Sequence, residues 1–90
     1  MAKDYDLISF LMRGKRRRKV LNALNKPKTP KDIAQECGIS TSNVSNALAE
    51  LQDKEMVECI TKDAHFFRFY SITTKGKALL KQLENKQQYN

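Results

Sequence analysis

Hydrophobic residues recur at helical spacing over two adjacent segments at the start of the chain. Residues 4–12 predict a short helix that Gly14 interrupts. A second helix begins at Lys15 and ends before Pro27, since proline lacks the amide hydrogen that a helix interior needs. The apolar positions are Leu7, Phe10 and Leu11 in the first helix and Val20, Leu21 and Leu24 in the second.

The next segment carries a strong helix-start signal. Thr29 is suited to the N-cap, Pro30 to the first helical position, and Asp32 follows three residues after the cap, as in a short-armed capping box. Gly38 then ends the helix, because glycine readily adopts the left-handed conformation past a helix end. This helix is therefore about two turns long.

A further helix follows after only three or four residues. Ser40 is suited to its N-cap, and the helical pattern runs to about Lys54. Its inward residues are Val44, Ala47, Leu48 and Leu51. Two helices joined by so short a turn form a helix-turn-helix.

The pattern changes after Lys54. Residues 56–61 (MVECIT) and 66–73 (FFRFYSIT) are rich in β-branched and aromatic residues, and the polar stretch KDAH separates them. They predict two antiparallel strands, and residues 73–86 predict a last helix. The fold class is therefore α+β and mainly α, with three core helices, a β-hairpin and a C-terminal helix.

The second strand carries an aromatic run, Phe66, Phe67, Phe69 and Tyr70. Alternate residues of a strand face opposite sides, so these four cannot all enter one core. We assign Tyr70 and Ile72 to the core. One or two phenylalanines are then left for a subunit interface or for packing under the N-terminal helix, with base stacking as a further alternative.

The charge of the chain is concentrated in one segment. The 90 residues have a formal net charge of +7, and the stretch from Arg13 to Lys31 contains many Lys and Arg but no Asp or Glu. A field of one sign favours nucleic acid or an acidic membrane surface as the partner, whereas a solvated basic face is the simpler alternative. Length and composition predict one folded domain over residues 1–90, with 1–14 as an N-terminal extension, 15–84 as its body and 85–90 as a tail.

Several classes of function are disfavoured. No apolar run approaches the about 20 residues that span a bilayer, and Asp4 and Asp6 stand where a signal peptide would be positive, so we expect a cytoplasmic protein without a membrane partner. Cys37, Cys59 and His65 do not make a four-ligand zinc site, and Cys37 is interpreted as a small core residue. No cofactor or metal is expected, and no catalytic constellation indicates an enzyme.

The order of elements resembles the winged helix-turn-helix transcriptional regulators, close to the compact MarR- and ArsR-like forms of archaea and bacteria. The resemblance rests on TPKDIAQECGISTSNVSNALAELQDKEMVE and FYSITTKGKALL and spans about residues 15–84. Where such families usually carry glycine before the β-hairpin, which is called the wing, this chain has Glu55. Their Tyr-x-Ile/Leu-Thr-x-x-Gly signature is present as Tyr70, Ile72, Thr73 and Gly76. The resemblance implies a winged helix that binds double-stranded DNA, as a homodimer.

The outward face of the helix after Ser40 predicts base contacts. Asparagine can pair with adenine through two hydrogen bonds, and Ser and Thr hydroxyls bond to bases or phosphate. Glu50 and Asp53 would be repelled by phosphate, so contact is expected only from the N-terminal half. The candidates are Thr41, Ser42, Asn43, Ser45 and Asn46. The alternative is that they are surface residues of a protein-binding helix.

These candidates carry no positive charge, so the attraction to DNA must come from other segments. Phosphate contacts supply most of the sequence-independent affinity. We predict them from the basic segment, from the two helix starts and from the wing, which would approach the backbone or an adjacent minor groove. The candidates are Arg13, Lys15, Arg16, Arg17, Arg18, Lys19, Lys28, Lys31, Ser40, Lys62, His65 and Arg68.

The resulting hypothesis is a sequence-specific DNA-binding transcriptional regulator, associated with the nucleoid and acting as a homodimer. Residues 4–12 and the last helix flank the motif and are the expected dimer elements. Two alternatives stay open: a winged helix used for protein–protein contact in a transcription, replication or sorting complex, and an RNA-binding winged helix. Function does not follow from fold alone.

Overall fold

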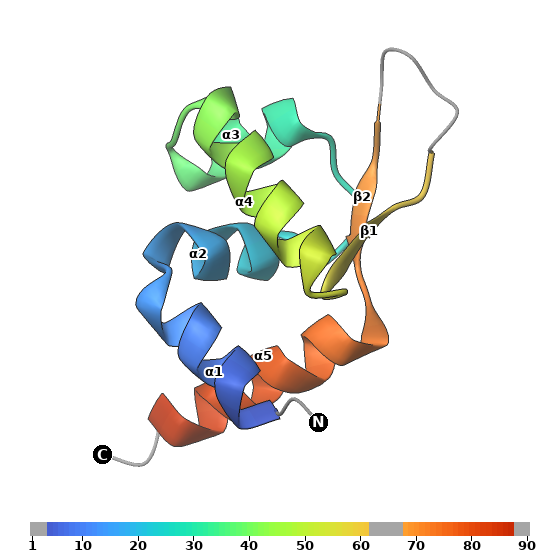
Figure 1. The fold of residues 1–90 in the computed structure, drawn as a ribbon. Coiled ribbons are helices and arrows are strands. Elements are labelled where there is room, and N and C mark those ends of the chain that lie inside the picture. The colour runs from blue at the N-terminus through green and yellow to red at the C-terminus, as the bar shows by residue number, and fades with distance from the viewer. Residues whose placement is uncertain (1–3, 62–67, 88–90) are drawn as a thin grey trace.

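The computed structural model describes residues 4–61 and 68–87 of the chain. In chain order the elements are α1 (Asp4–Arg13), α2 (Lys15–Ala23), α3 (Pro30–Cys37), α4 (Thr41–Asp53), β1 (Val57–Cys59), β2 (Tyr70–Ile72) and α5 (Thr74–Gln87). Figure 1 shows α3 and the start of α4 at one end, α1 and α5 at the other, and α2 between them. This is the mainly helical α+β winged helix-turn-helix that the sequence predicts.

The centre of the molecule is the packing of α2, α3 and α4 against one another (Figure 1). Leu21, Ile33, Val44 and Leu51 are fully buried, one or two from each helix. They are the inward positions of the helical patterns, so burial of these apolar faces explains the arrangement.

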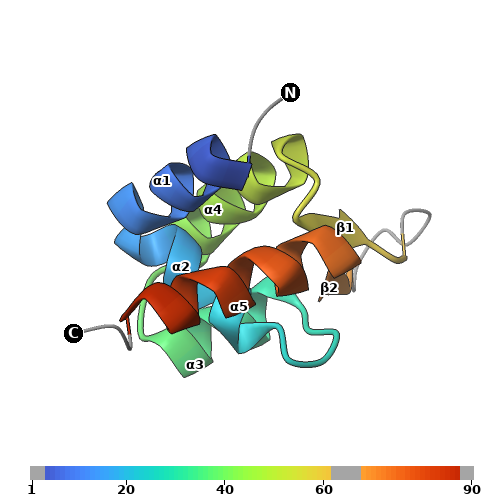
Figure 2. The same ribbon diagram turned by 90° about the horizontal axis from the view of Figure 1, so that it is seen from below.

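Helices α1 and α5 pack side by side beneath this centre, as Figures 1 and 2 both show. Leu7, Ile8 and Leu11 of α1 are buried, as are Leu79 and Leu83 of α5. The apolar face of α1 is therefore covered within the chain. None of the helices in the described part of the chain has the length and apolar content needed to cross a bilayer.

The two strands pair antiparallel, with Val57 opposite Ile72 and Cys59 opposite Tyr70. Each strand has three residues, fewer than predicted. Tyr70 also pairs with Lys28 through two backbone hydrogen bonds of 2.8 and 3.1 Å, so the segment after α2 lies along β2.

The aromatic run is only partly described. Tyr70 and Ile72 are half-buried and pack against the core, in agreement with their assignment. Phe69 is also half-buried, whereas Phe66 and Phe67 lie outside the described residues.

The turn between α4 and β1 contains Glu55 where glycine is usual, and Glu55 has a left-handed backbone with φ of 63°. The Met56 amide donates to the Leu51 carbonyl and the Glu55 amide to the Gln52 carbonyl, both at 2.9 Å. These two bonds form a Schellman cap, which requires a left-handed residue at the Glu55 position. The turn therefore keeps its tight form without glycine.

Thr73 and Gly76 join the start of α5 to this turn. The Thr73 hydroxyl accepts a hydrogen bond from the Gly76 amide (3.0 Å) and donates one to the Glu55 carbonyl (2.7 Å). A Cβ at residue 76 would lie closer than 3.0 Å to the Met56 carbonyl oxygen and to the Ile72 side chain. Close contact thus accounts for the Thr-x-x-Gly signature.

Candidate nucleic-acid interface

Two side-chain caps and one glycine set the geometry of the helix-turn-helix. The Thr29 hydroxyl accepts from the Asp32 amide (3.2 Å) at the start of α3, and the Ser40 hydroxyl accepts from the Asn43 amide (3.1 Å) at the start of α4. Between them Gly38 is left-handed, with φ of 70°. All three local predictions are confirmed.

The N-terminal half of α4 presents a neutral polar face. Thr41, Ser42, Ser45 and Asn46 are exposed and Asn43 is half-buried. The side chains that point inward from this helix, among them Val44 and Leu48, belong to the core. The five predicted base-contact residues thus lie together, on a face that carries hydrogen-bonding groups and no formal charge.

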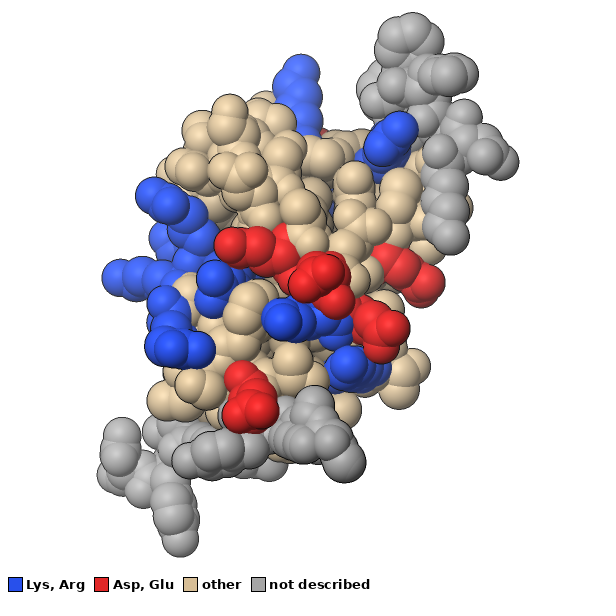
Figure 3. All heavy atoms as spheres, in the orientation of Figure 1, with Lys and Arg blue, Asp and Glu red and all other residues tan. Residues whose placement is uncertain are grey.

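A basic cluster lies where α1 meets α2, and we define it as Arg13, Lys15, Arg16, Arg18 and Lys19. Arg18 is half-buried and the other four are exposed. Figure 3 shows Lys and Arg side chains gathered along this flank of the molecule. Lys19 of the cluster adjoins the motif, because the Cys37 thiol at the end of α3 donates a hydrogen bond to the Lys19 carbonyl oxygen (3.5 Å).

The start of α2, where Gly14 is the N-cap, carries neither a side-chain cap nor an acidic residue. The positive end of the helix dipole therefore adds to the charge of the cluster. A shallow hollow of about 390 Å³ lies here, lined by Arg13, Gly14, Lys15, Arg16 and Arg17.

Other phosphate candidates are more scattered. Lys31 is exposed in the first turn of α3, and Ser40 is exposed at the start of α4. Arg68 is exposed beside β2. Lys62 and His65 lie outside the described residues, so their predicted contacts remain predictions.

Lys28 does not have the exposed side chain that a phosphate contact needs. It was predicted to contact phosphate, but its side chain is only 9% exposed, and its ammonium group donates to the Ala23 carbonyl, to Asn25 Oδ1 (3.2 Å) and to Glu36 Oε1 (2.7 Å). Burial of an ion is costly unless such partners replace water, and here they do. Lys28 thus ties the end of α2 to α3 and is not available to a ligand.

Arg17 also departs from its prediction. Its guanidinium donates from Nε to Glu50 Oε1 at 2.8 Å and from Nη1 to the Phe10 carbonyl at 2.8 Å. The bond from Arg17 lowers the pKa of the Glu50 carboxyl below its ordinary value of 4.5. The pairing with Glu50 could not be predicted from the sequence, because Arg17 and Glu50 are 33 residues apart.

Acidic side chains mark the other end of α4. Glu50 and Asp53 are exposed in its C-terminal half, and Glu55 and Glu58 are exposed just beyond it. Figure 3 shows Asp and Glu side chains gathered beside the basic flank. The interface is therefore polarised along α4, with a neutral start and an acidic end.

The sequence of the chain matches the family model described as the HVO_A0261 N-terminal domain over residues 5–88. The chain belongs to this family. No curated protein matches its sequence.

Solved structures of MarR family regulators share the fold. The MarR family transcription regulator SP03579 is 18% identical and covers 81% of the chain, with a TM-score of 0.73. NMB1585, a MarR family regulator from Neisseria meningitidis, is 24% identical, and ZitR from Lactococcus lactis, solved in complex with DNA, is 23% identical; both cover 81% of the chain with a TM-score of 0.69. The chain covers 50%, 54% and 51% of these three proteins, about half of their length.

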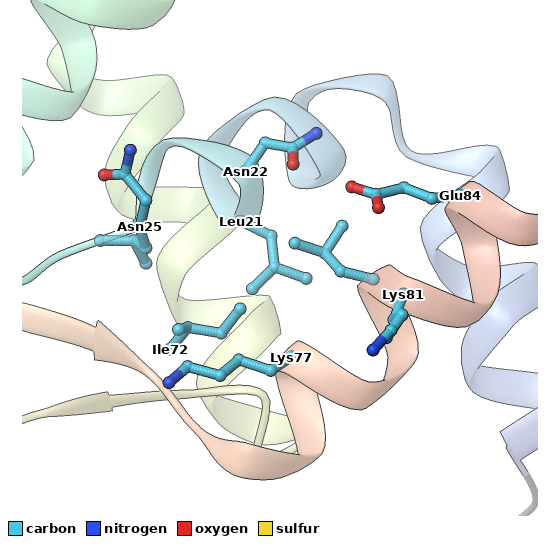
Figure 4. Close-up of a pocket in the computed structure, with 9 residues that line it drawn as sticks. Leu21, Asn22, Asn25, Ile72, Lys77, Lys81 and Glu84 are labelled. Carbon is cyan, nitrogen blue, oxygen red and sulfur yellow. The ribbon is translucent and has the colours of Figure 1, made fainter.

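This HVO_A0261-type domain also has a hollow away from α4. It measures about 310 Å³ and lies between the end of α2, β2 and α5. Figure 4 shows Leu21 and Ile72 in its floor and the amide of Asn22 with the charged ends of Lys81 and Glu84 around it. It contains none of the residues predicted to contact nucleic acid.

The two cysteines are free thiols that differ in burial. Cys59 is buried, and partial burial raises the pKa of the half-buried Cys37 thiol. Within residues 4–61 and 68–87, no three His, Cys, Asp or Glu side chains come together as a metal site would require.

Proposed function

We propose that the chain binds double-stranded DNA in a sequence-specific manner and acts as a cytoplasmic transcriptional regulator. The observation that carries the proposal is the neutral polar face of α4 beside an exposed basic cluster. Neutral groups suit the reading of base edges, whereas the cluster suits the phosphate backbone. The solved DNA complex of ZitR, which has the same fold, supports this choice of ligand.

In this proposal the N-terminal half of α4 enters the major groove. Asn43 and Asn46 have the amide groups that pair with adenine, and Thr41, Ser42 and Ser45 have hydroxyls that bond to bases or phosphate. Asp53, Glu55 and Glu58, at and beyond the end of α4, stay away from the backbone. Contact is thereby limited to about the first two turns of the helix.

The backbone contacts come from a smaller set than the sequence suggests. Lys28 and Arg17 are not among the proposed phosphate contacts, because their side chains have partners within the chain. The proposed contacts are the basic cluster, Lys31, Ser40 and the wing residues Lys62, His65 and Arg68. The uncapped start of α2 adds a partial charge to the cluster.

We further propose that two copies bind a roughly two-fold symmetric site, with half-sites about one helical turn apart. One module of this size has few base contacts, and pairing doubles them. The expected dimer elements are still α1 and α5. Since α1 buries Leu7, Ile8 and Leu11 against its own chain, the pairing surface has to include their outer faces, where Met12 is 53% exposed.

The test starts with selection of bound fragments from random genomic duplexes, followed by titration of the selected duplex at several salt concentrations. We expect log K to fall linearly with log salt, and the Arg16→Ala slope to be shallower by about 0.9. Asn46→Ala should lose the preference for the selected sequence with little change in slope. Lys81→Ala, which removes an exposed charge from α5, serves as the charge-matched control.

No binding to any duplex at low salt would exclude this function. The protein-binding alternative would then be favoured, and tighter binding to structured RNA than to duplex DNA would favour the RNA alternative. A specific feature already favours DNA or RNA over a protein partner, because the basic cluster lies beside the motif itself.

A further inference from the structure

Arg17 lies among basic residues but differs from them in its contacts. Its side chain is 25% exposed, and its guanidinium faces into the molecule, over the Phe10 ring at 4.0 Å from the ring centroid to Cζ. The same group donates to the Phe10 carbonyl and to both carboxylate oxygens of Glu50, at 2.8 and 3.5 Å. A single side chain of α2 therefore holds α1 and α4.

The local sequence makes room for this arrangement. A Cβ at Gly14 would lie closer than 3.0 Å to three side-chain atoms of Arg17, including Nε. Gly14 thus allows the guanidinium to fold back toward α1 and α4. Lys54 Nζ also lies over the Phe10 ring, 5.6 Å from its centroid, so two cations contact this ring.

Glu50 matters because of its place on α4. Residues four apart lie on the same side of a helix, so Glu50 follows Asn46 by one turn, about 6 Å along the axis. An ionised carboxylate at that position, if unpaired, would repel the phosphates that flank the groove. The fork of Arg17 cancels this charge next to the residues proposed to read the bases.

We propose that Arg17 is a positioning residue for DNA binding, which masks the Glu50 carboxylate instead of contacting phosphate. The inference rests on the proposed function. It assigns different tasks to neighbouring arginines: Arg16 neutralises the DNA backbone, whereas Arg17 neutralises a charge of the protein itself.

The deciding comparison is a double-mutant cycle of Arg17→Met and Glu50→Gln, titrated against the selected duplex. Methionine keeps an apolar stem but lacks the guanidinium that lies over the Phe10 ring, and the double variant keeps the net charge of the wild type. We expect Arg17→Met to weaken binding about five-fold, because Glu50 is left unpaired beside the DNA. Adding Glu50→Gln should restore affinity to within about two-fold of wild type.

The salt slope separates this role from a phosphate contact. The double variant should keep the wild-type slope, while Arg16→Met loses about 0.9 from it. A double variant with a slope lower by about 0.9 would overturn the inference, since it would show that Arg17 neutralises a phosphate. A double variant that binds no better than Arg17→Met would also overturn it, in favour of a purely structural arginine.

These outcomes are distinct from failure of the proposed function itself. If the wild-type chain binds no duplex, the function fails before any variant is compared, and the inference fails with it. If the wild type binds and the cycle shows no rescue, only the inference fails. Circular dichroism of each variant establishes that it is folded, and the double variant decides the question even if Arg17→Met alone is unstable.

Discussion

Replacement of Lys28 by methionine tests whether its buried ammonium group stabilises the fold. The group donates to the Ala23 carbonyl, to Asn25 and to Glu36, and the lysine as a whole is 8% exposed. Methionine fills similar space but donates no hydrogen bond. After the change, the side chains of Asn25 and the half-exposed Glu36 can hydrogen-bond to water, whereas the Ala23 carbonyl at the end of α2 loses a partner.

The expected cost follows from that difference. A buried polar group left unpaired costs about 1–3 kcal/mol, and the removal of a desolvated ion offsets part of it. We therefore expect Lys28→Met to lower the free energy of unfolding by about 1–2 kcal/mol. For a domain of this size that corresponds to a fall in Tm of about 4–16 °C.

Urea denaturation followed by circular dichroism measures the change, with Lys26→Met as the control, because Lys26 is an exposed lysine in the same segment. The control should stay within about 0.5 kcal/mol of wild type. A Lys28→Met protein as stable as the control would refute the reasoning, since it would mean that the apolar gain fully offsets the three hydrogen bonds.

Three further predictions concern the turn after α4, the start of α5 and the Glu50 carboxyl. Glu55→Gly should raise stability by about 0.5–1 kcal/mol in the same urea assay, because glycine adopts the left-handed backbone without strain, while Glu55→Ala should give no gain. Gly76→Ala should lower stability by about 1–3 kcal/mol, since its Cβ meets the Met56 carbonyl, and the exposed Lys77→Ala in the same turn should not. Because the pKa of Glu50 is lowered in the fold, its bond with Arg17 stabilises the fold above pH 4.5, and this contribution is lost as pH falls through the lower folded pKa. The stability difference between wild type and Glu50→Gln should therefore shrink toward pH 3. A difference that stays constant would contradict the pairing.

Most of the fold could be predicted because its signals are local. Thr29 and Ser40 accept hydrogen bonds from amides three residues away, and Gly38 adopts its left-handed conformation by itself. Short stretches of sequence are therefore enough to predict them. The periodic apolar positions likewise identify the core. The left-handed backbone of Glu55 could not be predicted in the same way, because glutamate is disfavoured in that conformation and so does not indicate it.

The candidate site was predictable in its neutral half and less so in its charged half. Ser, Thr and Asn at the start of α4 are exposed because the helical period puts them there. Lysines and arginines look alike in composition, however, and their tasks depend on partners brought near by folding. Lys28 bonds to the end of α2 and to Glu36, and Arg17 bonds to Phe10 and Glu50. Neither therefore belongs with the exposed cations.

The partners of Lys28 and Arg17 set a limit on the salt dependence that the phosphate candidates of the helices can produce. The basic cluster and Lys31 supply six cations per chain. If each neutralises one phosphate, the slope of log K against log salt cannot exceed about 5 for one protomer. A larger slope per bound complex would therefore require either a second protomer or additional cations, for which Lys62, Arg68 and a protonated His65 of the wing are the candidates. Once the number of copies per duplex is measured by analytical ultracentrifugation, the slope reports the use of the wing, independently of the sequence that α4 reads.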